Sequence, residues 1–319
     1  MMKKITIIAP ESFGYLDFLI KELNANPEVQ AVFINHSKIK YKYKSVFDKL
    51  FNVFRKIILN KNIKNSYKSQ EIIEQVEGLG EQDFIVVVRP DKLELNTIKS
   101  LKKYTKNYFS FYFDAISNFP EKVALIPYFD QVFSYEKDDI KKYNLSFITN
   151  YIYDFEVTNL LNSEYKIFNI SSFDERFQSL ENIATYLKKN NISYKIIVRK
   201  EKVDASEIVT FTEEYVPLSK VREFLLKADV LLDIQKENQS GLSFRVFESL
   251  GYQKKLITTN KDIIHYDFYN PNNIIVVDPK NIQIPKTFFE TSYQEIPNSI
   301  LYKYTLAGWI EKVFNIKPL

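Results

Sequence analysis

Short apolar segments of strand length alternate with segments of helical periodicity along this chain, and that alternation limits the fold to a narrow class. In the first half, the strand candidates Lys3–Ala9 and Val29–Ile34 enclose a helical pattern at Tyr15–Asn24. The run Phe84–Val88 is continuously apolar, which is typical of a strand buried on both faces of a parallel sheet. Because strands that alternate with helices form βαβ units, the sequence predicts an α/β fold.

The second half of the chain repeats this plan. The strand candidate Tyr165–Ile170 precedes a long helical pattern at Asp174–Asn190. A helix at Leu242–Leu250 is expected to end at Gly251 with a left-handed C-cap, and a final helix is expected at Asn298–Phe314. Further strands are expected at Tyr194–Val198, Ile208–Phe211, Val230–Ile234, Leu256–Thr258 and Ile274–Val277.

The length of 319 residues fits two domains of ordinary size. The polar, weakly periodic stretch 155–164 is the expected boundary, and it gives a first domain at 1–155 and a second at 156–300. Two Rossmann-like domains that face one another place a ligand cleft between the carboxyl ends of their strands. The predicted fold is therefore α/β, with two Rossmann-like domains facing a cleft.

The composition excludes several kinds of active site. The chain has no cysteine, which removes disulfides, thiolate metal ligands and cysteine nucleophiles. It has two histidines, His36 and His265, so a histidine-rich metal centre is not expected. The sequence contains no P-loop pattern, no G-x-G-x-x-G and no G-x-S-x-G. P-loop NTPases, dinucleotide enzymes with that fingerprint and serine hydrolases with that elbow are therefore disfavoured.

No apolar run in the sequence approaches the ~18 to 20 residues that a membrane-spanning helix needs. At the N-terminus the apolar run Ile5–Ala9 is interrupted by Glu11 and Ser12, too early for the core of a signal peptide. We therefore expect a cytoplasmic protein, either free or peripheral to the inner face of the cytoplasmic membrane.

Positive charge is concentrated in residues 38–68, which hold ten Lys or Arg and one acid, Asp48. Apolar residues recur there at helical spacing, while polar residues fall on other faces. Two interpretations are open for this helix. One is contact with an anionic membrane or an acidic, lipid-linked substrate, and the other is a core-facing helix with a solvated lysine face. No nucleic-acid-binding motif accompanies the charge, so nucleic acid is not an expected partner.

The segment Val230–Asn260 holds the strongest candidate for a ligand site. A buried strand is followed there by a polar loop and by Ser240-Gly241 at the expected entrance to a helix. A helix N-terminus offers N–H groups with partial positive charge, which suits a diphosphate. Arg245 could pair with the phosphates, and Glu248 could accept hydrogen bonds from ribose hydroxyls. The alternative is that Ser240 caps the helix and that Arg245 and Glu248 form a surface ion pair.

This segment resembles the donor-binding helix of GT-B glycosyltransferases. Two further runs, YFSFYFDAISNFPEKVALIPYFDQVFSYEKDD (108–139) and KKLITTNKDIIHYDFYNPNNIIVVD (254–278), resemble a bacterial group that makes lipopolysaccharide core or capsular polysaccharide. The resemblance implies that the first domain binds an acceptor, that the second binds a nucleotide-sugar donor, and that no metal or cofactor is required. It also implies that residues 301–319 form a helix that crosses back onto the first domain.

The resemblance also bears on stereochemistry. Glu248 matches the ribose-binding glutamate of the Glu-x7-Glu pattern of retaining GT-B enzymes, but the first glutamate of that pattern falls at Ser240. Whether the reaction retains or inverts the configuration of the sugar is therefore left open. An inverting enzyme also needs a carboxylate that deprotonates the acceptor hydroxyl, and Asp114 follows an apolar strand of the first domain.

The candidate site residues follow from this combination. Without a metal, cations and helix N–H groups must neutralise the leaving diphosphate. The expected catalytic residues are Asp114 and Arg245. The expected donor-binding residues are Ser240, Gly241, Leu242, Arg245, Glu248, Arg199 and Lys200, and the expected acceptor-binding residues are Arg89, Asp114 and Asp130.

The expected function is the transfer of a sugar from a nucleotide sugar to a glycan or lipid-linked acceptor during the synthesis of a bacterial surface polysaccharide. Two alternatives stay open. The missing first glutamate favours a non-catalytic GT-B-like partner in a glycan-synthesis complex, and an epimerase of nucleotide sugars would share the same two-domain plan.

Overall fold

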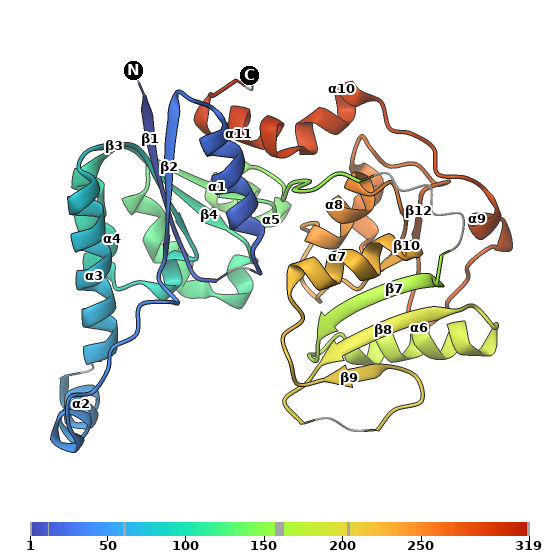
Figure 1. Cartoon of the computed structure of the whole chain (residues 1–319), viewed down its shortest axis with the longest axis horizontal. Coiled ribbons are helices and arrows are strands. Elements are labelled where there is room, and N and C mark those ends of the chain that lie inside the picture. The colour runs from blue at the N-terminus through green and yellow to red at the C-terminus, as the bar shows by residue number, and fades with distance from the viewer. Residues whose placement is uncertain (1, 12, 60–61, 157–162, 203–204, 318–319) are drawn as a thin grey trace. The chain divides into compact units, whose positions relative to one another are not determined.

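The structure, a computed structural model, describes residues 2–11, 13–59, 62–156, 163–202 and 205–317. The chain divides into two compact units (Figure 1). Unit 1 is Met1–Ile148 together with Phe314–Leu319, and unit 2 is Thr149–Val313. Each unit is built on one six-stranded sheet in which every paired strand is parallel. The predicted α/β architecture with two Rossmann-like units is confirmed.

Unit 1 has the strand order β2-β1-β3-β4-β5-β6. Its strands are β1 (Lys3–Ala9), β2 (Val29–Asn35), β3 (Gln82–Val88), β4 (Thr105–Tyr112), β5 (Gln131–Ser134) and β6 (Ser146–Phe147). Its helices are α1 (Tyr15–Ala25), α2 (Val46–Leu59), α3 (Ile63–Leu79), α4 (Leu95–Leu101) and α5 (Lys137–Tyr143). Ile85 and Val87 of β3 share a buried core with Ile72 and Val76 of α3. The continuous apolar run in β3 is explained by this burial.

Unit 2 has the strand order β12-β11-β10-β7-β8-β9. Its strands are β7 (Tyr165–Ser172), β8 (Tyr194–Arg199), β9 (Thr210–Thr212), β10 (Ala228–Asp233), β11 (Lys255–Thr258) and β12 (Ile274–Val276). Its helices are α6 (Phe177–Lys189), α7 (Leu218–Leu226), α8 (Phe244–Gly251), α9 (Lys286–Glu290), α10 (Asn298–Leu301) and α11 (Leu306–Phe314). Alternate residues of β10 enter two different cores, Leu231 on one face and Val230 and Leu232 on the other. This strand is therefore covered on both sides.

Gly251 does not form the expected left-handed C-cap. It is the last residue of α8, and the cap is Tyr252 with φ −94°. A Cβ atom at position 251 would lie 2.3 Å from the carbonyl oxygen of Asp154 and 2.6 Å from Cγ2 of Ile152. The prediction of a left-handed cap was wrong, because glycine is required here by close packing and not by an unusual φ.

The final helix is broken where a single helix was expected. A short 3₁₀ turn at Tyr302–Tyr304 separates α10 from α11, and Thr305 is extended, with φ −77° and ψ 163°. Thr305 forms a parallel bridge with Ile152, whose N–H donates to Tyr304 O at 2.7 Å and whose carbonyl accepts from the N–H of Leu306 at 3.2 Å. This strand-like pairing takes residue 305 out of the helix.

The division between the units lies at Ile148 and Thr149, ahead of the expected boundary at 155. The segment that follows is tied into unit 2 by several contacts. Asn150 Nδ2 donates to Leu242 O at 2.9 Å, Ile152 bridges to Thr305, and the hydroxyl of Tyr153 donates to Glu248 Oε1 at 2.5 Å.

Near its end the chain returns to unit 1. Most of α11 belongs to unit 2, and the return begins at Phe314 rather than at the expected residue 301. The ring of Phe314 packs edge-on against that of Phe84 in β3, with the centroids 5.2 Å apart. The crossing back of the chain is therefore made at the last residue of α11.

Candidate functional site

In both units the strand order reverses once, between β1 and β3 in unit 1 and between β7 and β10 in unit 2. Ligands of open parallel sheets bind beyond the carboxyl ends of the strands at such a switch point, where the loops diverge to opposite faces and leave a crevice. An arginine follows a strand at each of these points, Arg89 after β3 and Arg176 after β7. The two groups of charged residues around these arginines are therefore the candidate sites.

Arg89 stands at the end of β3 in a left-handed backbone conformation, with φ 57° and ψ 59°. This conformation costs a residue with a Cβ roughly 1–2 kcal/mol. Pro90 follows and opens a short 3₁₀ turn, Pro90–Lys92, closed by the N–H of Lys92 donating to Arg89 O at 3.0 Å. The turn brings Asp91 back beside the Arg89 side chain. Such strain is often found at functional sites, where the surrounding structure holds it in place.

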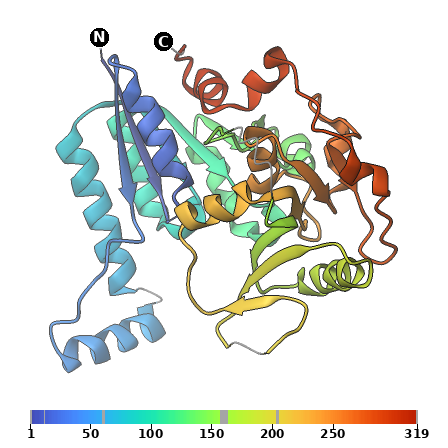
Figure 2. The same ribbon diagram turned by 45° about the vertical axis from the view of Figure 1, so that its right-hand side comes forward.

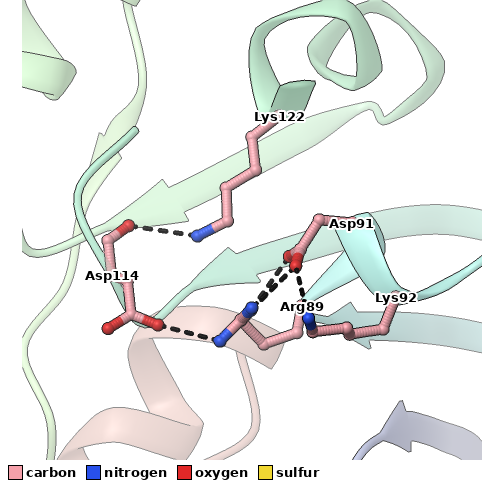
Figure 3. Close-up of polar contacts among 5 residues, drawn as sticks. All are labelled: Arg89, Asp91, Lys92, Asp114 and Lys122. Carbon is pink, nitrogen blue, oxygen red and sulfur yellow. Dashed lines mark hydrogen bonds and ion pairs between the residues drawn. The ribbon is translucent and has the colours of Figure 1, made fainter. Parts of the chain in front are cut away.

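The Arg89 guanidinium holds two carboxylates (Figure 3). Its Nε and Nη2 donate to the two oxygens of Asp91 at 2.9 and 2.7 Å, and its Nη1 donates to Asp114 Oδ2 at 3.0 Å. The Asp91 side chain is buried, at 1% exposed. Although burial raises the pKa of Asp91, its hydrogen bonds and charge pairing with Arg89 outweigh burial and lower that pKa. Asp91 therefore serves to hold the arginine.

Asp114 follows β4, and its side chain is 22% exposed. Oδ2 of its carboxylate is held by Arg89, whereas Oδ1 points away from the arginine and accepts no hydrogen bond from any residue that the structure describes (Figure 3). Arg89 and Asp114, which were both expected to bind the acceptor, are brought together by this ion pair, and their role in acceptor binding stays a prediction. Oδ1, the open oxygen that accepts no such hydrogen bond, is the one that can accept a proton from a bound hydroxyl group.

Lys122 completes the Arg89 cluster, which we define as Arg89, Asp91, Asp114 and Lys122. It is fully buried, its Nζ donates to the backbone carbonyl of Asp114 at 3.2 Å, and it lies over the ring of Phe119 at 4.8 Å. Burial lowers the pKa of Lys122 to about 8. Sequence analysis missed this residue because its 3₁₀ segment, Pro120–Tyr128, has neither helical nor strand periodicity. The available signal was a lysine directly before the apolar run VALIPYF (123–129).

Asp130 lies in the same sheet, but at the amino-terminal end of its strand. It directly precedes β5, accepts the N–H of Tyr108 at 2.8 Å through Oδ2, and forms an ion pair with Lys102. Asp114 instead follows β4, at the carboxyl edge. The structure therefore separates the two carboxylates that were expected to contact the acceptor, because one precedes its strand and the other follows its strand.

In unit 2 the corresponding arginine bridges the two loops of the switch point. Nε and Nη2 of Arg176 donate to the oxygens of Asp174 at 2.9 and 2.6 Å, and Nη1 donates to the carbonyl of Ile234, after β10, at 3.3 Å. Although burial acts to lower the pKa of Arg176, the pairing with Asp174 raises it. Sequence analysis missed Arg176 because a helix was expected from Asp174, whereas α6 begins at Phe177.

The helix α8 begins three residues later than the expected entrance at Ser240-Gly241. Its N-cap is Ser243, whose Oγ accepts the N–H of Arg245 and donates to Asp233 Oδ1 at 2.7 Å. The prediction that Ser240 stands at the helix entrance, and the alternative that it caps the helix, were therefore wrong. The loop carbonyls of Ser240 and Leu242 accept from the side-chain amides of Asn260 and Asn150, and that of Gly241 accepts from Gln235.

Arg245 and Glu248 form a buried pair on α8. Arg245 Nη1 donates to Glu248 Oε2 at 2.5 Å, and the hydroxyl of Tyr153 donates to Oε1, also at 2.5 Å. The exposed fractions of the two side chains are 11% and 1%, so this is not a surface ion pair. Each oxygen of Glu248 already accepts a hydrogen bond from a neighbouring side chain. The ribose-binding role of Glu248 stays a prediction.

Arg199 and Lys200 lie at and just after the end of β8, at the carboxyl edge of the unit 2 sheet. The Arg199 side chain is exposed, and its Nε donates to Glu213 O at 3.5 Å. The Lys200 ammonium lies over the rings of Phe173 and Phe211, at 4.5 and 5.3 Å. Both residues are one strand away from the switch point that Arg176 occupies.

Among the residues that the structure describes, no group of three or more His, Asp or Glu side chains could hold a metal ion. No protein-family model matches the chain, and no curated protein matches it in sequence.

Solved structures share the fold of the chain at low identity. A UDP-forming α,α-trehalose-phosphate synthase from Burkholderia xenovorans matches with a TM-score of 0.56 and 11% identity, covering 98% of each chain. A UDP-GlcNAc 2-epimerase from Neisseria meningitidis, bound to UDP-GlcNAc, matches with a TM-score of 0.53 and 11% identity, covering 99% of this chain and 100% of that one. A further UDP-N-acetylglucosamine 2-epimerase matches with a TM-score of 0.51 and 12% identity, covering 99% and 98%. The chain thus has the two-unit GT-B architecture.

Proposed function

We propose that this protein is a glycosyltransferase that moves a sugar from a nucleotide-sugar donor to a hydroxyl group of a glycan or lipid-linked acceptor. The observation that carries the proposal is the open carboxylate oxygen of Asp114, held in place through its other oxygen by Arg89. A transferase that deprotonates an acceptor hydroxyl needs a carboxylate of this kind at the carboxyl edge of a sheet. The GT-B architecture supports the same class of reaction by analogy.

Asp114 is proposed to act as the general base, and Arg89 to position it. Arg89 fixes the rotamer of Asp114 and is itself fixed by the buried carboxylate of Asp91. When the acceptor hydroxyl loses its proton to Asp114, the hydroxyl oxygen attacks the anomeric carbon, and the bond to the nucleoside diphosphate breaks with its electron pair. Such a base typically contributes about 10²–10⁴-fold to the rate.

The donor is proposed to bind at the carboxyl edge of the unit 2 sheet. A leaving diphosphate must be neutralised by fixed cations when no metal is present. Arg176 lies at the switch point, and its hydrogen bonds to described residues use three of the five guanidinium N–H donors. Arg245, Arg199 and Lys200 supply further positive charge from α8 and from the end of β8.

The acceptor class follows from the resemblance of residues 108–139 and 254–278 to enzymes of lipopolysaccharide core and capsular polysaccharide synthesis. We propose a surface glycan, or its lipid-linked precursor, as the acceptor and the cytoplasm as the place of the reaction.

An epimerase of nucleotide sugars is the second candidate, because two of the structures with the same architecture are UDP-GlcNAc 2-epimerases. The two candidates differ in what they need. An epimerase converts one nucleotide sugar into another without an acceptor, whereas a transferase breaks the bond between the anomeric carbon and the phosphate oxygen and releases a nucleoside diphosphate or monophosphate.

The first experiment is a thermal-shift screen of the full chain against UDP, GDP, CMP, dTDP and the sugars of each nucleotide, since a ligand that binds the native state raises the melting temperature. The nucleotide sugar that gives a shift is then incubated with a panel of glycan and lipid-linked acceptors, and nucleotide release is measured. Asp114→Asn is expected to lower kcat by about a hundredfold or more and to leave donor binding unchanged. Arg176→Gln is expected to weaken donor binding by about tenfold or more.

The matched control is Asp130→Asn, the same substitution at the amino-terminal end of a strand in the same sheet. This variant should have a kcat close to that of the wild type. Equal rates for Asp114→Asn and the wild type would overturn the role of Asp114. Epimerised nucleotide sugar without any acceptor would replace the transferase by the second candidate. The absence of a thermal shift with every nucleotide would favour a non-catalytic partner protein.

A further inference from the structure

Helix α2 turns its apolar face outward. Seven of its large apolar side chains are between 48% and 81% exposed: Val46, Phe47, Leu50, Phe51, Val53, Phe54 and Ile58. Successive residues of a helix are about 100° apart, so these seven positions fall on one face. A helix at the surface of a soluble domain normally buries such a face. The interpretation of a core-facing helix with solvated lysines is therefore wrong for α2.

The polar face of α2 is anchored within unit 1. The buried Asn52 donates from Nδ2 to the hydroxyl of Tyr43 at 2.8 Å and accepts the N–H of Ile63 at 2.8 Å. Asp48 accepts the hydroxyl of Tyr41 at 2.6 Å. These contacts fix the rotation of the helix about its axis. In both views α2 projects beyond the end of α3, away from the sheet of unit 1 (Figures 1 and 2).

The length of α2 suits a position along a membrane surface. Fourteen helical residues extend over about 21 Å, less than the ~30 Å of a bilayer's hydrocarbon core. None of the helices that the structure describes is both long and apolar enough to cross a membrane. A short helix with one apolar face and basic flanks binds in the headgroup region, with the apolar face buried among the upper acyl chains.

The charge around α2 decides between the possible occupants of this face. Residues 38–68 hold ten Lys or Arg and one Asp, and the lysines with exposed side chains include Lys38, Lys40, Lys42, Lys44, Lys49 and Lys64. A second copy of this chain would bring an equally basic segment against it, and the like charges would repel. An anionic lipid surface offers opposite charge together with an apolar layer.

We propose that α2 and its flanking lysines dock unit 1 on an anionic lipid bilayer. The apolar face enters the bilayer, while the lysines that flank the helix contact the headgroups. The polar anchor at Asp48 and Asn52 keeps the helix attached to unit 1 while its apolar face is in lipid.

Vesicle binding of the full chain tests this proposal. Wild-type protein is expected to cosediment with vesicles of phosphatidylcholine mixed with phosphatidylglycerol at least about tenfold more tightly than with phosphatidylcholine alone, and less tightly as salt is raised. Phe47→Ser combined with Phe54→Ser is expected to remove binding. Its matched control is Phe155→Ser combined with Ile264→Ser, two exposed apolar residues of unit 2.

Charge is tested separately. Lys40→Glu, Lys42→Glu and Lys44→Glu together are expected to weaken binding to the anionic vesicles by at least about tenfold. The matched control, Lys261→Glu, Lys280→Glu and Lys286→Glu, makes the same change in net charge at exposed positions of unit 2 and should bind as the wild type does. Equal loss in both triple variants would overturn the assignment to this segment.

A tryptophan introduced into α2 tests directly whether the apolar face of the helix enters the bilayer. The chain has one tryptophan, the buried Trp309 of unit 2, so the emission that Phe47→Trp adds reports on α2. A blue shift of that emission with anionic vesicles is expected. Binding that is equal for both vesicle types would overturn the anionic surface. A dimer in the absence of lipid that dissociates in the Phe47→Ser and Phe54→Ser variant would assign the face to a second copy instead.

Discussion

At the scale of single residues, His36 is a buried neutral imidazole at the carboxyl end of β2. It is 2% exposed, and burial, together with the positive charge of Lys68, lowers its pKa to about 4. The unfolded chain has the ordinary value of about 6.5, so the unfolded state binds more protons than the folded state between these two pH values. The stability that this group contributes is therefore fully present above about pH 6.5 and is lost as the pH falls toward 4.

We expect His36→Leu to reduce the loss of stability on acidification. Over the full window, the wild type should lose on the order of 3 kcal/mol through this residue, and the variant should lose that much less. Urea unfolding of both proteins at pH 7 and pH 4.5 measures the difference. If the two proteins lose the same free energy of unfolding between these pH values, His36 is not the group that titrates.

Residues of the candidate site were predictable only where strand position decided their place. Arg89 and Asp114 follow adjacent parallel strands, so the rule that carboxyl ends meet at one edge brought them together. The same rule could have separated Asp130, which precedes its strand. Lys122 and Arg176 could not be found this way, because one lies in an aperiodic segment and the other was assigned to a helix that starts after it.

At the scale of elements, the apolar patterns located almost every strand, but they did not determine where helices start, end or face. The position of Ser243 as N-cap of α8 depends on Asp233, ten residues earlier, which accepts its hydroxyl. The outward rotation of α2 depends on side-chain contacts with Tyr41 and Tyr43. Periodicity shows that a helix has an apolar face, but the direction in which that face turns is set by side-chain contacts with residues outside the helix.

Two glycines in helices give a matched pair for testing the packing of α8. Gly251→Ala places a Cβ within 2.3 Å of the Asp154 carbonyl oxygen, so we expect a loss of about 2–3 kcal/mol in the free energy of unfolding, as for overpacked sites. Gly78→Ala, in α3, meets no atom within 4 Å and should stabilise the protein by about 0.5–1 kcal/mol through helix propensity. Denaturant unfolding of both variants checks the opposite signs. A Gly251→Ala protein as stable as the wild type would show that α8 can move away from residues 152–154.

At the scale of the whole molecule, unit 1 is assembled from two distant parts of the chain. Phe314 is buried against Phe84 of β3, so it belongs to the core of unit 1 although the 165 residues before it (Thr149–Val313) form unit 2. Phe314→Ala is expected to lower the free energy of unfolding of unit 1 by about 3–5 kcal/mol and to leave that of unit 2 unchanged.

Hydrogen exchange measured by peptide is the appropriate readout, because it resolves the two units. In Phe314→Ala, amides of β1 and β3 should exchange about a hundredfold faster or more, while those of β10 and β11 keep the wild-type rate. Phe288→Ala, a buried residue of unit 2, should give the reverse pattern. Faster exchange in both units of the Phe314→Ala protein would mean that they unfold as one cooperative body.

The late position of Phe314 also has a consequence for synthesis on the ribosome. The strands of unit 1 emerge first, but their last packing partner is translated only after all of unit 2. At ordinary rates of translation, this delay lasts roughly 10 to 30 seconds. For that time the nascent chain carries an uncovered Phe84 as well as the apolar face of α2, and it is then most in need of a chaperone or of early contact with a membrane. A chain interrupted before residue 314 would have every residue of unit 2, but its unit 1 would lack the side chain that packs against Phe84.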